Sequence, residues 1–147
     1  MNKLFLILIN IIFYYPIHGM SLDSINKIDE LGRTHLIYAA ENDQIDIVET
    51  LLKKGADINA QCNSGWTALM WASKNNNLKM VNILLDHDCD ITLKNSGGHT
   101  AKFYTQDKQI ELTLIMARKR LFLIKKMKTG VNLFKKVQSR EIGLTWN

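Results

Sequence analysis

The feature that most constrains the fold of this chain is a repeat with a period of 33 residues. Gly32, Gly65 and Gly98 follow one another at this step. Other positions keep the same step: Thr34, Thr67 and Thr100; Tyr38, Trp71 and Tyr104; Ala39 and Ala72; Val48 and Val81; Asp57 and Asp90. Such self-similarity indicates stacked units that bury their apolar faces against neighbouring units. It predicts a solenoid, whose extended surface suits partner binding better than an enclosed catalytic pocket.

Each unit is predicted to be a helix, a turn and a second helix. Thr34 stands where an N-cap is expected, because its hydroxyl can accept from the first free amides of a helix. Small and apolar residues follow at helical spacing from 36 to 40, and a polar turn occupies 42–44. The apolar pattern of 45–52 predicts the second helix, which Gly55 ends by adopting positive φ. The second unit repeats this plan.

Two stretches of the first unit, Gly32 to Ala40 and Ile47 to Ala60, resemble the opening and closing motifs of the ankyrin repeat family. In the second unit, Gly65 to Leu69 and Leu84 to Ile91 match the same motifs. The resemblance implies an all-α fold, a short ankyrin-repeat solenoid of helix-turn-helix units joined by β-turn loops. The chain departs from the family where proline and histidine are usual, and we expect some loss of stability from this.

The resemblance divides the chain into segments. Residues 21–28 are the remnant of a preceding repeat, 29–61 form ankyrin repeat 1, 62–94 form repeat 2, and 95–116 form a degenerate repeat 3. In repeat 3, Lys102 replaces the leucine of the earlier repeats, as expected for a terminal repeat whose outer face meets water. Its second helix fits only with one residue deleted, which aligns Ile110 with Ile45 and Leu112 with Ile47.

The first 20 residues are predicted to be a signal peptide. Lys3 precedes an apolar run from Leu4 to Tyr15, and Pro16 and Gly19 follow. A basic start, a short apolar stretch and small residues at the end are typical of a secretory signal. The chain is therefore expected to be exported, or membrane-tethered if the segment stays uncut. The abundance of Asn, Ile and Lys suggests an AT-rich genome, such as that of a host-dependent bacterium.

The C-terminal segment, residues 117–147, is basic. It carries nine Lys and Arg against Glu141 alone, within a chain of net charge +5. Apolar residues alternate with these bases, and Thr129-Gly130 is predicted to divide two short helical segments. This basic amphipathic tail could lie on an anionic membrane, contact nucleic-acid phosphates, or pack over the last repeat as a cap. The stretch from Gln138 could also be unstructured.

The sequence offers no pattern of catalytic chemistry. The densest polar cluster is 86–90, but successive residues of one turn cannot all point at one ion. Phosphate loops, nucleophile elbows and spaced carboxylate pairs are absent from the sequence. We therefore expect no enzyme activity, no metal, no cofactor and no small-molecule substrate. Cys62 and Cys89 are predicted to be free thiols.

The leading interpretation is a protein–protein interaction module. By resemblance, the turn tips and inner helices contact a partner, and these positions carry Glu30, Leu31, Arg33, Glu41, Asn42, Asn63, Ser64, Trp66, Lys74, Asn75 and His99. Trp66 either projects toward a partner or folds onto its own repeat, whereas the aromatic residues at 38, 71 and 104 are predicted to pack. The alternative function is a peripheral membrane or nucleic-acid binder that acts through 117–147. A decaying gene product is a third possibility.

Overall fold

The computed structural model describes residues 22–142, and the side chains of 24–129. The predicted signal peptide lies outside the described residues. Seven helices form within the described range: α2 (Leu22–Ile25), α3 (His35–Glu41), α4 (Ile45–Lys53), α5 (Ala68–Lys74), α6 (Leu78–Asp86), α7 (Ala101–Tyr104) and α8 (Lys108–Ile142). The described part contains no β-strand, although an isolated antiparallel bridge joins Ile28 and Thr34. The predicted all-α class is confirmed.

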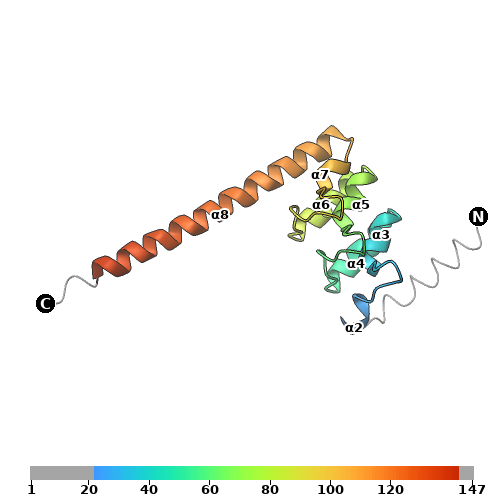
Figure 1. The fold of residues 1–147 in the computed structure, drawn as a ribbon, viewed down its shortest axis with the longest axis horizontal. Helices are drawn as coiled ribbons and strands as arrows, with labels where there is room; N and C mark the ends of the chain where they lie inside the picture. The colour runs from blue at the N-terminus through green and yellow to red at the C-terminus, as the bar shows by residue number, and fades with distance from the viewer. Residues whose placement is uncertain (1–21, 143–147) are drawn as a thin grey trace, which may run out of the picture. The chain divides into compact units, whose positions relative to one another are not determined.

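The helices form the predicted hairpins. Helix α3 packs on α4, and α5 packs on α6. The first helices of successive units also pack on one another, α3 against α5 and α5 against α7, so they form one continuous row (Figure 1). Side-by-side hairpins of this kind are the architecture of a helical solenoid. The chain divides into two compact units between Glu111 and Leu112, and each is described by itself below.

Threonine side chains cap the N-termini of two inner helices, α3 and α5, as predicted. The hydroxyl of Thr34 accepts from the backbone N–H of Ile37 at 3.3 Å, and Thr67 accepts from Met70 at 3.3 Å. Thr100 occupies the same position before α7 but makes no side-chain capping bond. The third repeat therefore keeps the cap residue and lacks its hydrogen bond.

Left-handed residues end helices and shape the turns between them. Gly55 has φ of 83°, and Asp88, which replaces it in the second repeat, has φ of 57°. Asp43 and Asn76 also take positive φ, at 60° and 53°, within the polar turns of the two hairpins. Asp and Asn tolerate this region better than most residues, because their short polar side chains can hydrogen-bond locally. The positive φ predicted for Gly55 is confirmed, and Asp88 ends the corresponding helix of the second repeat in the same conformation.

The core lies between the stacked hairpins and consists of small and branched aliphatic residues. Its fully buried members include Leu36, Ile37, Ala40, Val48, Leu51, Ala68, Ala72, Val81 and Leu84. Alanine on the inner helices lets adjacent helices approach closely, so a thin unit can still bury a continuous apolar layer. The apolar positions of the amphipathic pattern in the sequence are therefore the ones that pack in the core.

The third repeat is shorter than the others. Helix α7 spans only four residues, and the side-chain oxygen of Asn76 from the preceding repeat accepts from the N–H groups of Gln106 and Asp107 at 3.0 and 3.2 Å. The one-residue deletion predicted for the second helix of this repeat is wrong, because Ile110 is fully buried whereas Ile45 is half-buried, and Leu112 is 45% exposed whereas Ile47 is buried. Lys102 is exposed and pairs with Glu111 at 3.4 Å. The polar replacement is therefore accommodated by an ion pair at the surface.

The prediction that Thr129-Gly130 divides two helical segments is wrong. Helix α8 continues through this dipeptide to Ile142, so the stretch from Gln138 to that residue is helical as well. The Thr129 hydroxyl donates to the carbonyl of Lys126 at 2.8 Å, which keeps it within the helix. A single glycine costs a helix about 1 kcal/mol and does not by itself end it.

Candidate protein-binding face

Three five-residue turns form one edge of the repeats. Each is closed by a backbone hydrogen bond of 3.1 Å between its first and last residues: Asp29 with Arg33, Cys62 with Trp66, and Asn95 with His99. The side chains of Asp29 and Asn95 stabilise their turns by accepting from backbone N–H groups inside them. Each turn is a rigid loop that ends on the side chain predicted to face a partner.

Neighbouring turns are joined to one another by the backbone. The N–H of Asn63 donates to the carbonyl of Leu31, and the N–H of Ser96 donates to the carbonyl of Ser64, each at 3.0 Å. Gly65 has φ of 75° and lies against the backbone of Asn95, so a side chain would not fit there. The turn tips therefore form one ordered ladder, in which the relative position of each tip is set by the backbone of the next.

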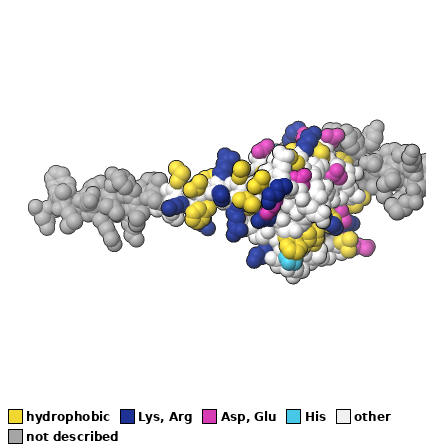
Figure 2. Space-filling view, turned by 90° about the horizontal axis from the view of Figure 1, so that it is seen from above, with side chains coloured by type: hydrophobic (Ala, Val, Ile, Leu, Met, Phe, Trp, Pro, Cys, Tyr) yellow, Lys and Arg dark blue, Asp and Glu magenta, His cyan; other side chains and the backbone are white. Residues whose placement is uncertain are grey.

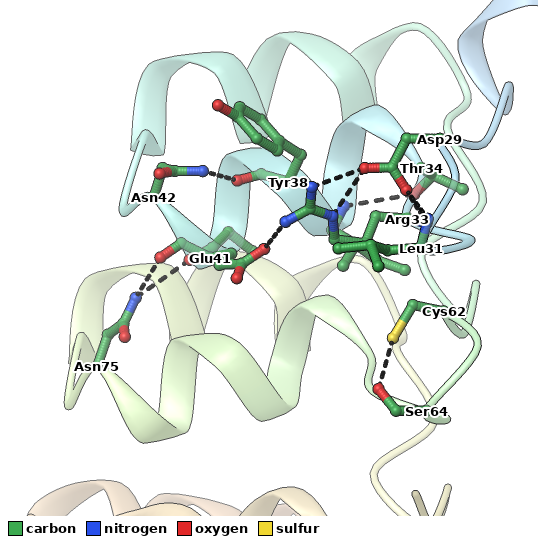
Figure 3. A network of polar contacts seen from close by, with 12 residues as sticks. Asp29, Leu31, Arg33, Thr34, Tyr38, Glu41, Asn42, Cys62, Ser64 and Asn75 are labelled. Carbon is green, nitrogen blue, oxygen red and sulfur yellow. Dashed lines mark hydrogen bonds and ion pairs between the residues drawn. The ribbon is translucent and has the colours of Figure 1, made fainter. Parts of the chain in front are cut away.

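The first rung of this ladder is an ion-pair network (Figure 3). The Arg33 guanidinium contacts the carboxylates of Asp29 and Glu41, each at 2.7 Å, and lies 5.2 Å from the centre of the Tyr38 ring. Burial opposes ionisation of Asp29, but the hydrogen bonds and charge of Arg33 outweigh it and lower the pKa of Asp29. Burial likewise disfavours the Arg33 cation, and the two carboxylates more than compensate, which raises its pKa.

The second rung is aromatic, and we call Trp66 with its neighbours Trp71, Tyr104 and Lys74 the Trp66 rung. The Trp66 ring lies 4.6 Å from Trp71 on α5 and 4.2 Å from Tyr104 on α7, both measured between ring centroids. The ammonium of Lys74 lies 4.5 Å from the Trp71 ring centre and 5.3 Å from that of Trp66. A cation over an indole face is attracted by the ring quadrupole. Trp66 stays half-buried, so it packs onto its own and the next repeat and still reaches the surface.

The third rung pairs His99 with Phe103. The two rings stack with centroids 3.7 Å apart, and the Phe103 ring meets Tyr104 edge-on at 5.3 Å. Phe103 is nevertheless 63% exposed. The aromatic surface therefore continues from the second repeat into the third and ends in an exposed apolar ring.

Several of the predicted contact residues hold the scaffold together. The Asn63 amide donates to the carbonyl of Glu30. The Asn75 amide donates to the carbonyls of Ala40 and Glu41 (Figure 3). The Asn42 amide donates to a carbonyl of its own helix at 2.8 Å. These asparagines join repeats or end a helix, and their side-chain donors are already engaged.

The remaining predicted residues lie at the surface of the turns. Glu30 and Leu31 are exposed at the tip of the first turn, and Leu31 is a large apolar side chain. Ser64 is exposed at the second tip, where its hydroxyl lies 3.2 Å from the Cys62 sulfur. The turn tips thus offer apolar, acidic and hydroxyl groups beside the three rungs.

Sequence reasoning missed part of the aromatic surface. Trp71 and Tyr104 were expected only to pack, yet both are half-buried and contribute to the second rung. Phe103 was not a candidate at all. Its exposure depends on how α7 lies on α5, and the sequence pattern does not report this. The 33-residue spacing of the aromatic residues was the only signal for such a surface.

The described residues were also compared with the requirements of a metal site and of a membrane-spanning helix. Among them, no group of three or more His, Cys, Asp and Glu side chains is arranged to hold a metal ion. Among the helices searched, none combines the length and the apolar character needed to cross a membrane. Both cysteines are free, as predicted, and burial raises the pKa of Cys89 to about 12.

Comparison with known proteins identifies the repeat. A family model for ankyrin repeats in three copies matches residues 5–95. The chain belongs to the ankyrin repeat family. The matched stretch begins within the segment predicted to be a signal peptide and ends where the degenerate repeat is predicted to start. Ankyrin repeats generally serve as protein–protein interaction modules, and the fold is typically non-catalytic.

The fold is also similar to a solved structure, the ankyrin repeat domain of Bcl-3, described as a unique member of the IkappaB protein family. The two share 30% sequence identity and a TM-score of 0.63, over 70% of this chain and 44% of that one. This ankyrin chain therefore matches less than half of the Bcl-3 domain. The comparison with curated proteins found no match.

Proposed function

We propose that this ankyrin protein binds another protein through the turn tips and inner-helix ends, with the Trp66 rung as the anchor. The observation that carries the proposal is the position of Trp66, whose ring packs between those of Trp71 and Tyr104 and is still half-buried at the surface. An aromatic ring held by its neighbours loses little conformational entropy on binding. Trp and Tyr are also the residues that most often dominate interface energetics.

The charges along the face favour a partner segment of mixed polarity. Arg33 is neutralised by two carboxylates, and Glu30 adds a further negative charge at the first tip. On the second rung, Lys74 has no carboxylate of the described residues within ion-pair distance. The partner therefore carries an apolar or aromatic side chain for the Trp66 rung, with an acidic group nearby to meet Lys74.

Affinity capture with matched variants tests the proposal. The full chain is compared with Trp66→Ala, Lys74→Ala and Lys79→Ala, and the captured proteins are quantified. Lys74 lies at the end of inner helix α5 and Lys79 lies on α6, and both side chains are exposed. We expect a partner that is lost with Trp66→Ala, reduced with Lys74→Ala and retained with Lys79→Ala.

The outcome depends on the variants being folded, which circular dichroism measures. Since the exposed lysines carry little packing, both lysine variants should keep the wild-type helix content. Equal recovery of every captured protein by all four chains would remove the Trp66 rung from the interface. Equal loss with both lysine variants would point to a nonspecific effect of charge.

Export through residues 1–20 is the corresponding proposal for location. It rests on the basic start and short apolar run of that segment. Expression with a C-terminal epitope, followed by N-terminal sequencing of the protein outside the cell, tests it. A secreted chain that begins near Met20 supports the proposal, and a chain retained in the cell with Met1 intact contradicts it.

A further inference from the structure

The second unit of the chain presents basic and apolar side chains together. Between Leu112 and Thr129, helix α8 contains six Lys and Arg and no Asp or Glu. All six bases are exposed. Figure 2 shows hydrophobic and basic side chains interleaved along the described part of α8. A binding partner of this surface must accommodate positively charged and apolar side chains at the same time.

Four of the exposed apolar residues share one side of the helix. Leu112, Met116, Leu123 and Met127 follow one another at intervals of 4, 7 and 4 residues. At about 100° per residue, these four lie within a sector of about 60° and extend about 22 Å along the axis. Their side chains are between 45% and 71% exposed. We call these four residues the apolar stripe.

Basic residues flank the apolar stripe on both sides. By the same helical geometry, Lys119 and Lys126 lie about 20–40° from one edge of the stripe, and Arg120 lies about 20° from the other. Long basic side chains can bury their methylene stems and keep the charged end at a polar boundary. The three cations can therefore reach a negatively charged plane while the stripe is buried in it.

The middle of the apolar stripe decides between a flat surface and a protein groove. The helical turn between Met116 and Leu123 presents Lys119 and Arg120 instead of apolar side chains. A closed apolar groove would desolvate these charges, which is costly without paired carboxylates. At a bilayer surface the same side chains extend into the headgroups. Duplex nucleic acid would use the bases but would leave the stripe without a function.

From this arrangement we propose that α8 binds the surface of an anionic lipid bilayer through the apolar stripe and its flanking bases. The helix lies along the headgroup boundary, with Leu112, Met116, Leu123 and Met127 toward the acyl chains. The proposal is independent of protein binding by the repeats. It concerns the second compact unit by itself.

Vesicle binding by the full chain tests the proposal. Neutral phosphatidylcholine vesicles are compared with vesicles containing about a quarter phosphatidylserine, and we expect binding at least about tenfold tighter to the anionic ones, since each base near such a surface contributes about 1 kcal/mol. The same measurement is made with Leu123→Gln/Met127→Gln, on the stripe, and Leu121→Gln/Phe122→Gln, off it. All four replaced side chains are exposed, and Gln favours helices about as well as Leu and Met.

The two double variants have opposite expected results. Loss of the stripe residues should weaken binding to anionic vesicles about tenfold or more, whereas the off-stripe variant should stay within about threefold of wild type. A third variant, Lys119→Gln/Arg120→Gln/Lys126→Gln, should lose about 100-fold, because each charge near an anionic surface contributes about a factor of five. Circular dichroism confirms equal helix content.

Residues 1–20 are the same in every variant, so a difference in vesicle binding between variants comes from α8. Equal binding to neutral and anionic vesicles overturns the proposal, as does equal loss by the two double variants. Duplex DNA binding is measured at the same salt concentration by fluorescence anisotropy. If the charge variant loses DNA binding while the stripe variant binds vesicles as wild type does, the bases serve nucleic acid and the lipid proposal is wrong.

Discussion

The ring of Trp66, at the end of the second turn, lies 4.2 Å from the ring of Tyr104 in the third repeat, measured between centroids. The two residues are far apart in the sequence, and the contact crosses a repeat boundary. This contact links the predicted contact face to the stability of the degenerate third repeat. The same ring that we propose as an anchor therefore also helps to hold the end of the solenoid.

Replacing Trp66 with alanine should destabilise the repeats. Two aromatic contacts are lost, each worth about 0.5–1.5 kcal/mol, so the free energy of unfolding should fall by about 1–3 kcal/mol. Trp66→Phe, which keeps a ring, should lose less than half as much. Urea unfolding followed by circular dichroism measures both. A Trp66→Ala protein as stable as wild type would contradict the packing described for the second rung.

Two glycines with the same backbone conformation should respond differently to alanine. Gly65 and Gly98 have φ of 75° and 76°, so an alanine at either costs about 1–2 kcal/mol in the left-handed region. At Gly65 the added Cβ would also lie 2.8 Å from the Cα of Asn95, whereas at Gly98 nothing lies within 4 Å. Gly65→Ala should therefore lower the thermal midpoint clearly more than Gly98→Ala. Equal shifts would mean that the two turns are not in backbone contact.

The three capping threonines form a matched series. Thr34 and Thr67 accept capping hydrogen bonds from Ile37 and Met70, so replacing either with alanine should cost about 1 kcal/mol. Thr100 makes no such bond, and its replacement should cost only a few tenths. Denaturant unfolding of the three variants measures the difference. A Thr100→Ala loss as large as the other two would show that α7 is capped in solution.

Asp29 should make stability depend on pH. Its pKa is lowered in the folded protein, so its contribution is present above the unfolded value, near 4, and is lost as pH falls through the lower folded pKa. Asp29→Asn removes the charge, and Asn95 shows that asparagine supports the same turn. The variant should be less stable at pH 7 by at most about 1 kcal/mol, since the pair is partly exposed.

The measurement for Asp29→Asn is urea unfolding between about pH 7 and pH 2. The stability difference from wild type should shrink below about pH 4, where the native carboxylate begins to take up its proton. A difference that stays constant across this range would show that Asp29 acts through its hydrogen bonds and not through its charge.

The two thiols should react at different rates. Cys89 is buried, and burial raises its pKa to about 12, so almost none of it is thiolate at pH 8. Cys62 is only half-buried and should react first. A chromogenic disulfide reagent should label one thiol in the native protein and the second only in denaturant, and Cys62→Ser should abolish the fast phase. Two fast phases would contradict the burial of Cys89.

Much of the repeat architecture could be predicted from local patterns. Thr34 and Thr67 cap helices, and Gly55 and Asp88 adopt positive φ, because capping and left-handed turns depend on a few neighbouring residues. The aliphatic faces of α4 and α6 could be read from helical spacing for the same reason. The prediction of a helix break at Thr129-Gly130 was wrong, because a glycine weakens a helix without ending it.

The candidate site was predicted less well. The sequence correctly placed Arg33 and Trp66 on the turns, but it could not distinguish Asn75, whose amide joins two repeats, from residues free to meet a partner. It also assigned Trp71 to packing alone. Each of these outcomes depends on which groups meet across repeats.

The sequence by itself therefore determined the period, the helix ends, the aliphatic core positions and the family, since these depend on near neighbours and on regular spacing. The tertiary structure alone decided that Trp66 is held between Trp71 and Tyr104, that Arg33 is neutralised by two carboxylates, and that Phe103 is left exposed. The physical reason is that a side chain's contacts across stacked repeats depend on how closely the helices approach and how they are turned, and no local pattern records either.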